Sequence, residues 1–152
     1  MIRFLKGLWK ALNQSSQNKE DALTLSSKEG IARFLYDKSA WSKQPVLKPK
    51  PKVFYPEFFE GQWETSVCRT SSISEQRIWE IAHKAREPRL ALARAELIAG
   101  SVEGVGLSTV SAPDLERSYP EHAVIVGWPD EKEKQMALAI QLVVSSSLVF
   151  AP

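Results

Sequence analysis

The chain has 152 residues, 43% of them hydrophobic, which is enough apolar material for one core and too short for two full domains. Its apolar runs are interrupted by charges, so none approaches the roughly 20 residues that span a bilayer. The one cysteine, Cys68, excludes an intramolecular disulfide and a cysteine-rich zinc site. The first residues do not match a signal peptide, so we expect a soluble protein of the cytoplasm.

The net charge of +2 is unevenly distributed along the chain. Residues 1–60 carry eleven Lys and Arg against six Asp and Glu, whereas residues 61–152 carry nine against twelve. The first part is therefore +5 and the second −3. We expect the basic part to meet an acidic surface, which is either another protein, a phosphate backbone or the acidic body itself.

Residues 1–19 are predicted to form an amphipathic helix followed by a polar linker. Apolar residues recur there every three or four positions, as one face of a helix requires. An isolated helix of this length is marginal in water, so its apolar face should rest on the body, on a partner or on a membrane surface. The candidate partner-binding residues on this face are Leu5, Leu8, Trp9 and Leu12.

Residues 20–60 are predicted to contain a helix and then a basic, proline-rich strap. Ser27 is a plausible N-cap for a helix that carries Ile31, Phe34 and Leu35. Four of the nine prolines then fall within residues 42–56, which excludes a helix there and favours an extended, polyproline-like segment.

The strap also suggests an alternative function. Lys48, Lys50 and Lys52 alternate with prolines, and several aromatic residues, including Tyr55, follow them closely. Lysines that bind phosphates beside rings that stack on bases are typical of single-strand nucleic-acid binding. Aromatic residues that pin the strap to the core explain the same pattern, and large aromatics more often serve packing.

Residues 61–152 are predicted to form an α+β core with a small mixed sheet and three or so packed helices. In chain order, the patterns first predict a strand over Trp63–Arg69, a helix capped by Ser72 and Glu75 that runs to Arg86, and a second helix over Arg89–Glu103. They then predict a short strand over Val105–Val110 and a central strand over His122–Trp128. The last elements are a helix over Met136–Val144, introduced by Asp130 and Glu133, and a strand over Ser147–Ala151. The helix over Met136–Val144 is apolar nearly all round, which is typical of a helix buried on every side.

The chain has no phosphate-binding glycine loop, no nucleophile elbow and no metal-ligand motif, so we expect neither a cofactor nor a metal. His122 opens the central strand and could act as a general base whose tautomer Glu121 or Glu64 fixes, with Arg69 holding an anion nearby. A histidine that bonds loop backbone, and an arginine that pairs with a surface carboxylate, are the alternative.

Cys68 and His122 could in principle form a nucleophile and a base, although a free cysteine more often behaves as a buried small hydrophobe. The stretches Ser66–Arg69, Ser74–Trp79 and His122–Pro129 are similar to those of small bacterial proteins without an assigned activity. This resemblance implies no site residues.

The leading hypothesis is a non-enzymatic accessory or adaptor subunit within a bacterial multiprotein complex. A protein partner or a second copy of the chain would be its ligand. A small enzyme or ligand-binding domain that uses His122 and Arg69, and a nucleic-acid-binding module that uses the strap, are the alternatives.

Overall fold

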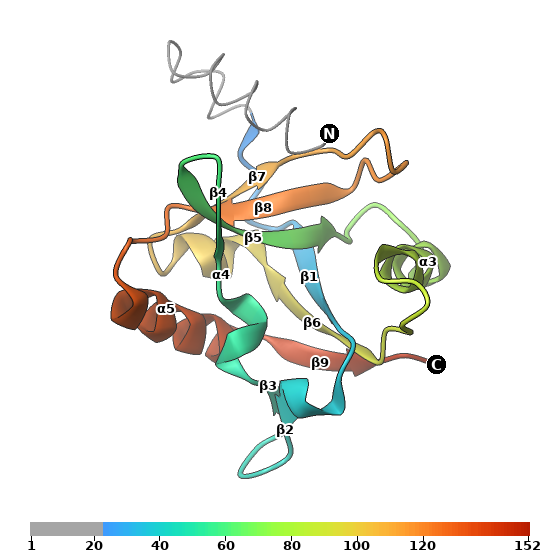
Figure 1. The fold of residues 1–152 in the computed structure, drawn as a ribbon, viewed down its shortest axis with the longest axis horizontal. Helices are drawn as coiled ribbons and strands as arrows, with labels where there is room; N and C mark the ends of the chain where they lie inside the picture. Colours follow the sequence, from blue (N-terminus) through green and yellow to red (C-terminus); the bar gives the residue numbers. More distant parts are fainter. Residues whose placement is uncertain (1–22) are drawn as a thin grey trace.

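An antiparallel sheet forms the centre of the molecule, with helices on both sides (Figure 1). The computed structural model describes residues 23–152, in which the strands pair in the order β7-β8-β5-β1-β6-β9, with β4 beside the start of β5. The strands are β1 Gly30–Leu35, β4 Glu57–Phe59, β5 Gln62–Arg69, β6 Ala93–Ile98, β7 Ser108–Ser111, β8 His122–Val126 and β9 Ser147–Phe150. The fold class is α+β, but each of these pairs is antiparallel, so the prediction of a mixed sheet is wrong.

The predicted helix and linker of residues 1–19 lie outside the described residues. The candidate partner-binding residues there, Leu5, Leu8, Trp9 and Leu12, therefore stay predictions. Within residues 23–152, no helix has the length and apolar character that crossing a membrane requires.

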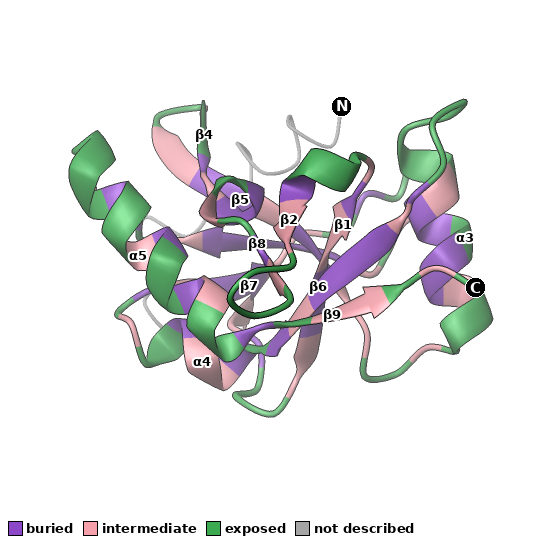
Figure 2. Cartoon of the chain, turned by 90° about the horizontal axis from the view of Figure 1, so that it is seen from below, coloured by how far each residue is buried: buried purple, intermediate pink, exposed green. Residues whose placement is uncertain are grey.

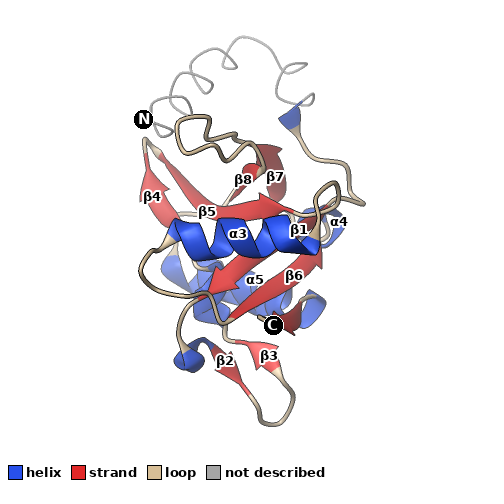
Figure 3. Cartoon of the chain, turned by 90° about the vertical axis from the view of Figure 1, so that its right-hand side faces the viewer, coloured by secondary structure: helices blue, strands red, loops and turns tan. Residues whose placement is uncertain are grey.

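The helices cover the two faces of the sheet, as Figure 3 shows with α3 in front of the strands and α5 behind them. The helices are α3 Glu75–Ala85, α4 Ala99–Glu103 and α5 Lys132–Ser145. On one face, Trp79 and Ala82 of α3 pack with Phe34 and Tyr36. The larger core lies on the other face, where α4, α5 and the short 3-10 helix η2 (Pro51–Phe54) contribute buried side chains. The buried side chains of both faces give the sheet two apolar layers.

The segment after Ser27 is strand β1, so the helix predicted there is wrong. The main-chain carbonyl of Ser27 accepts a hydrogen bond from the Gly100 amide, and no helix begins after Ser27. Ile31 and Leu35 occur at helical spacing, but both are also buried in a strand that lies between β5 and β6. Local propensity is weak compared with the ladder hydrogen bonds and burial available at an interior position. The sheet therefore combines residues from both sides of residue 60.

The helix predicted over Arg89–Glu103 is also wrong for most of its length, because β6 occupies Ala93–Ile98 and only Ala99–Glu103 is helical. Ala93, Ala95 and Leu97 are buried at alternate positions, as a strand requires. Alanine favours helices, but here its small side chain packs within a sheet that pairs β6 with both β1 and β9.

Three predicted strands are confirmed near their expected positions: β5 in residues 62–69, β8 in residues 122–126 and β9 in residues 147–150. The predicted strand at residues 105–110 begins later, at Ser108. β8 is an interior strand between β5 and β7, which agrees with its apolar sequence.

The two predicted capping boxes are wrong in detail although the helices exist. Ser74, not Ser72, caps α3, and its Oγ accepts a hydrogen bond from the Arg77 amide. Glu131 occupies the N-cap of α5 without a side-chain bond, while Asp130 accepts a hydrogen bond from Trp63. Asp130 therefore has a tertiary partner that the local pattern does not reveal.

The proline-rich residues 42–56 are not one continuous extended strap. Trp41–Ser42 (β2) pairs with Lys48–Pro49 (β3), and a turn of 3-10 helix follows at Pro51–Phe54. Pro51 suits the start of that turn, because its fixed φ is close to a helical value. The turn places Phe54 in the core, where it is 0% exposed.

Ion pairs connect α3 to neighbouring strands. Arg77 donates two hydrogen bonds of 3.1 Å to Glu121 at the start of β8, and Arg94 of β6 donates bonds of 2.6 and 2.8 Å to Glu75. The hydrogen bond from Arg77 lowers the pKa of Glu121, and the one from Arg94 lowers the pKa of Glu75. The attachment of α3 should therefore weaken in acid.

We expect Glu121→Gln to lower the free energy of unfolding by about 1 kcal/mol at neutral pH, a size limited by solvent screening, and to have a progressively smaller effect as the solution is made more acidic. The pKa of Glu121 is lowered by folding, so the ionised carboxylate stabilises the fold above its unfolded pKa. This stability is lost as the pH falls through the folded pKa. Urea unfolding across this pH range measures the difference. Glu87→Gln, at an exposed position, is the control, and a Glu121→Gln effect that persists in acid would contradict the explanation.

Candidate functional site

A cavity of about 420 Å³ lies beside β1 and β5, next to the end of α3. Residues from β1, β4, β5, the start of β8, the end of α3 and the loop of residues 112–120 line it. Among the residues predicted for catalysis, His122 and Glu64 are in its lining, whereas Arg69 and Glu121 are not. The predicted combination of His122 with Arg69 is therefore not brought together in this cavity.

His122 lies at the start of β8, opposite Cys68 in the register of β5 and β8. Its Nδ1 is 2.6 Å from the carbonyl oxygen of Ala112, and because a carbonyl only accepts, this nitrogen carries a hydrogen and donates it. The Tyr119 ring meets the imidazole edge-on with 5.2 Å between centroids. These contacts fix the ring orientation and connect the sheet to the loop of residues 112–120.

The Cys68 side chain is buried, and its Sγ donates a hydrogen bond to the Arg69 carbonyl oxygen at 3.4 Å. Burial raises the pKa of this thiol to about 11. Cys68 lies directly opposite His122 on the sheet, but a nucleophilic cysteine requires a thiolate. The surroundings of Cys68 therefore favour a protonated, packing side chain.

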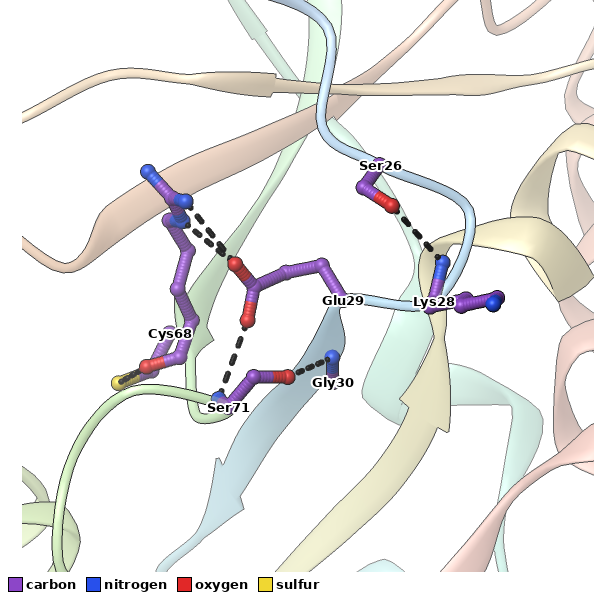
Figure 4. Close-up of polar contacts among 7 residues, drawn as sticks. Ser26, Lys28, Glu29, Gly30, Cys68 and Ser71 are labelled. Carbon is purple, nitrogen blue, oxygen red and sulfur yellow. Dashed lines mark hydrogen bonds and ion pairs between the residues drawn. The ribbon is translucent and has the colours of Figure 1, made fainter.

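Arg69 belongs to a different cluster. It follows Cys68 in β5, so its side chain leaves the sheet on the opposite face. Its Nε and Nη2 donate to Glu29 Oε1 at 3.2 and 2.9 Å. Figure 4 shows Glu29 accepting from the Ser71 amide while Ser71 Oγ accepts from the Gly30 amide. This network fastens the start of β1 to the end of β5, which is a structural role.

Arg33 also lines the cavity, although no sequence motif includes it. β1 pairs with β6 along its whole length but with β5 only at Ile31 and Ala32, so β1 and β5 separate beyond this point. The Arg33 guanidinium crosses the opening, with Nε donating to the Val53 carbonyl at 3.1 Å and Nη1 to the Ser66 carbonyl at 3.0 Å. A single arginine within the otherwise apolar run of residues 31–35 was the available signal.

The outer side of α5 carries an exposed apolar stripe. Ile140 and Val144 are 51% and 72% exposed and Met136 is 39% exposed, whereas Leu142 on the inner side is 0% exposed. The prediction of a helix buried on every side is therefore wrong for the described chain. Figure 2 shows the exposed residues along the side of α5 that faces away from the sheet.

Two more exposed apolar residues, Val46 and Leu47, lie in the loop between β2 and β3. Lys48, which follows them, donates hydrogen bonds to the carbonyl oxygens of Val144 and Ser146 at the end of α5. The loop is thereby attached to this end of the helix. We call Val46, Leu47, Met136, Ile140 and Val144 together the outer apolar face.

The residues proposed for nucleic-acid binding are partly engaged elsewhere. Lys48 bonds to α5, and Lys52 Nζ donates to Ser39 Oγ at 3.2 Å. Lys50 is exposed, and Tyr55 packs against the main core. The interpretation of Tyr55 as a residue that pins the strap agrees with this packing.

Comparisons with protein-family models, with curated proteins and with solved structures found no match for the chain.

Proposed function

We propose that this protein is a non-enzymatic accessory subunit that binds a protein partner through the outer apolar face. The observation that carries the proposal is a mismatch between the sequence of α5 and its surroundings. The helix is apolar nearly all round, as in helices buried on every side, but the described chain covers only the side with Ala139 and Leu142. A partner surface would supply the missing cover.

The size of the exposed stripe supports this proposal. Contiguous exposed apolar patches typically mark interaction sites, whereas single exposed apolar side chains are common. Full burial of a large apolar side chain contributes about 1.5–3 kcal/mol, and the exposed parts of Met136, Ile140 and Val144 would each contribute a share of this, before the entropic cost of association is subtracted. The rest of the partner interface would have to supply the remaining free energy of binding.

The charges around the face indicate the chemistry of the partner. Lys43 and Lys50 are exposed, and they precede and follow Val46 and Leu47 in the sequence. Interfaces combine an apolar centre with a polar rim, and opposite charges across the rim increase the association rate and the specificity. We therefore propose a partner with an apolar surface bordered by acidic side chains.

Ile140→Asp tests the proposal, because it places a charge at the centre of the face without touching the inner side of α5. A tagged full-length chain is used to capture the partner, which is then identified, purified and titrated against the wild-type and variant chains. We expect the variant to raise the Kd at least about tenfold, the effect of losing a central contact. We also expect binding to weaken at high salt.

Leu115→Asp is the matched control, because Leu115 is 68% exposed in the loop of residues 112–120, away from α5. Equal loss of binding in both variants would overturn the proposal.

Light scattering of the full chain tests whether a second copy covers the outer apolar face, and deletion of residues 1–19 tests whether those residues cover it. A dimer that dissociates on the Ile140→Asp substitution would mean that a second copy of the chain covers the outer apolar face. Partner binding that appears only after the deletion would mean that residues 1–19 cover it. Either result would contradict the proposal that a separate protein covers this face.

A further inference from the structure

The cavity contains a cation, the Arg33 guanidinium. Within residues 23–152, no carboxylate comes within ion-pair distance of Arg33, which is held by two main-chain carbonyl groups. Burial lowers the pKa of Arg33, and the charge of Glu57 opposes this effect only in part. A partly desolvated guanidinium with neutral acceptors gains more from an added anion than one that already has a carboxylate.

A second guanidinium faces the same cavity. Arg86, just beyond α3, is in the lining, and its charge lowers the pKa of Arg33 further. Arg86 lies over the Tyr36 ring, 5.8 Å from its centroid, and the Tyr36 hydroxyl donates to the Ala82 carbonyl at 2.6 Å. Two cations that repel each other across a cavity are stabilised by an anion placed between them.

The acidic residues of the lining lie elsewhere around the cavity. Asp114 is buried in the loop of residues 112–120. Its carboxylate accepts a hydrogen bond from the Arg117 amide and forms an ion pair with the Arg117 side chain at 3.7 Å. Glu57 comes from β4 and Glu64 from β5, where Gln62 donates to Glu64 at 3.2 Å. The lining is therefore mixed in charge, and its basic part is the region of Arg33, Tyr36 and Arg86.

The remaining lining is rich in rings. Tyr55, Tyr119 and His122 all face the cavity, and such surfaces favour planar ligand groups. The volume of about 420 Å³ is within the range of small-molecule sites. The cavity thus offers cations for one end of a ligand and aromatic side chains for its body.

We infer that this cavity binds a small organic anion with a planar body, whose charged group lies between Arg33 and Arg86. The carboxylate and the phosphate are the two anionic groups of this class that guanidinium binds well. The inference does not depend on the proposed partner binding, because none of the residues of the outer apolar face lines the cavity.

Titration of the full chain with phenyl phosphate, benzoate and inorganic phosphate, followed by backbone amide NMR, tests the inference. We expect saturable shifts at residues 32–34 and 66–68, with the two planar probes binding more tightly than inorganic phosphate. Which planar probe binds better identifies the anionic group. Arg33→Met should raise the Kd of that probe at least about tenfold, as expected when a buried charge pair loses one partner.

Arg33→Met also removes hydrogen bonds to two carbonyl groups and could unfold the chain, so Arg86→Met provides an independent variant. Arg86 is exposed, and its replacement should leave the fold intact while weakening probe binding at least about threefold. Lys132→Met, at an exposed position on α5, removes the same charge at a distance and should leave the Kd unchanged. Absence of saturable shifts, or equal weakening by Arg86→Met and Lys132→Met, would overturn the inference.

Discussion

Phe54→Ala should lower the free energy of unfolding by about 3–5 kcal/mol, one of the two largest effects that we expect from a single substitution. Phe54 is 0% exposed and is among the largest fully buried side chains of the described residues. It comes from η2, which packs between α5 and β1, so the cavity left by its removal would border several elements. Rigid surroundings collapse little into such a cavity, and the cost is then high.

Urea unfolding of wild type and Phe54→Ala measures this difference. Phe58→Ala is the matched control, because Phe58 is 57% exposed and its main ring contact is with Trp63, 5.0 Å between centroids. We expect the control to cost about 1 kcal/mol, the size of an exposed aromatic pair. Equal costs for the two substitutions would contradict the placement of η2 under the sheet.

Leu142→Ala should lower the free energy of unfolding by about 2–5 kcal/mol, whereas Ile140→Ala on the same helix should change it by less than about 1 kcal/mol. Leu142 is 0% exposed on the inner side of α5 and Ile140 is 51% exposed on the outer side. Both substitutions change helix propensity in the same direction, so the difference between them reports burial.

Thermal and urea unfolding at several protein concentrations provide the measurement. If Ile140→Ala cost as much as Leu142→Ala, and the cost increased with protein concentration, another copy of the chain would cover the outer apolar face. This result would contradict the assignment of that face to a different protein. A low cost at all concentrations agrees with a face that is open in the isolated chain.

The sequence predicted the strongest local patterns of the core correctly. The apolar run of β8 predicted an interior strand, and the structure confirms it, since most of its residues are buried. The stripe of Ile78, Ile81 and Ala82 predicted α3, since three- and four-residue spacing places them on one face. In these elements the local pattern and the tertiary environment agree.

The candidate site was less accessible to sequence reasoning. His122 was correctly seen as a residue at the start of a strand, and it lines the cavity. Arg69 does not line the cavity but pairs with Glu29. Side chains alternate along β5, so Arg69 leaves the sheet on the face opposite Cys68. Arg33 becomes a cavity residue only because β1 and β5 separate, and strand separation has no local signature.

What the sequence by itself determined is the α+β class, the apolar strands, α3 and the two-sided apolar character of α5, because these follow from the periodicity of side chains along the chain. The tertiary structure decided that residues 30–35 and 93–98 are strands, since pairing with distant segments outweighs the small free energies of helix propensity. It also decided that the outer side of α5 is uncovered and that Arg33 and Arg86 share a cavity. Both properties depend on which segments come together in space, and side-chain spacing along one segment contains no information about its distant neighbours.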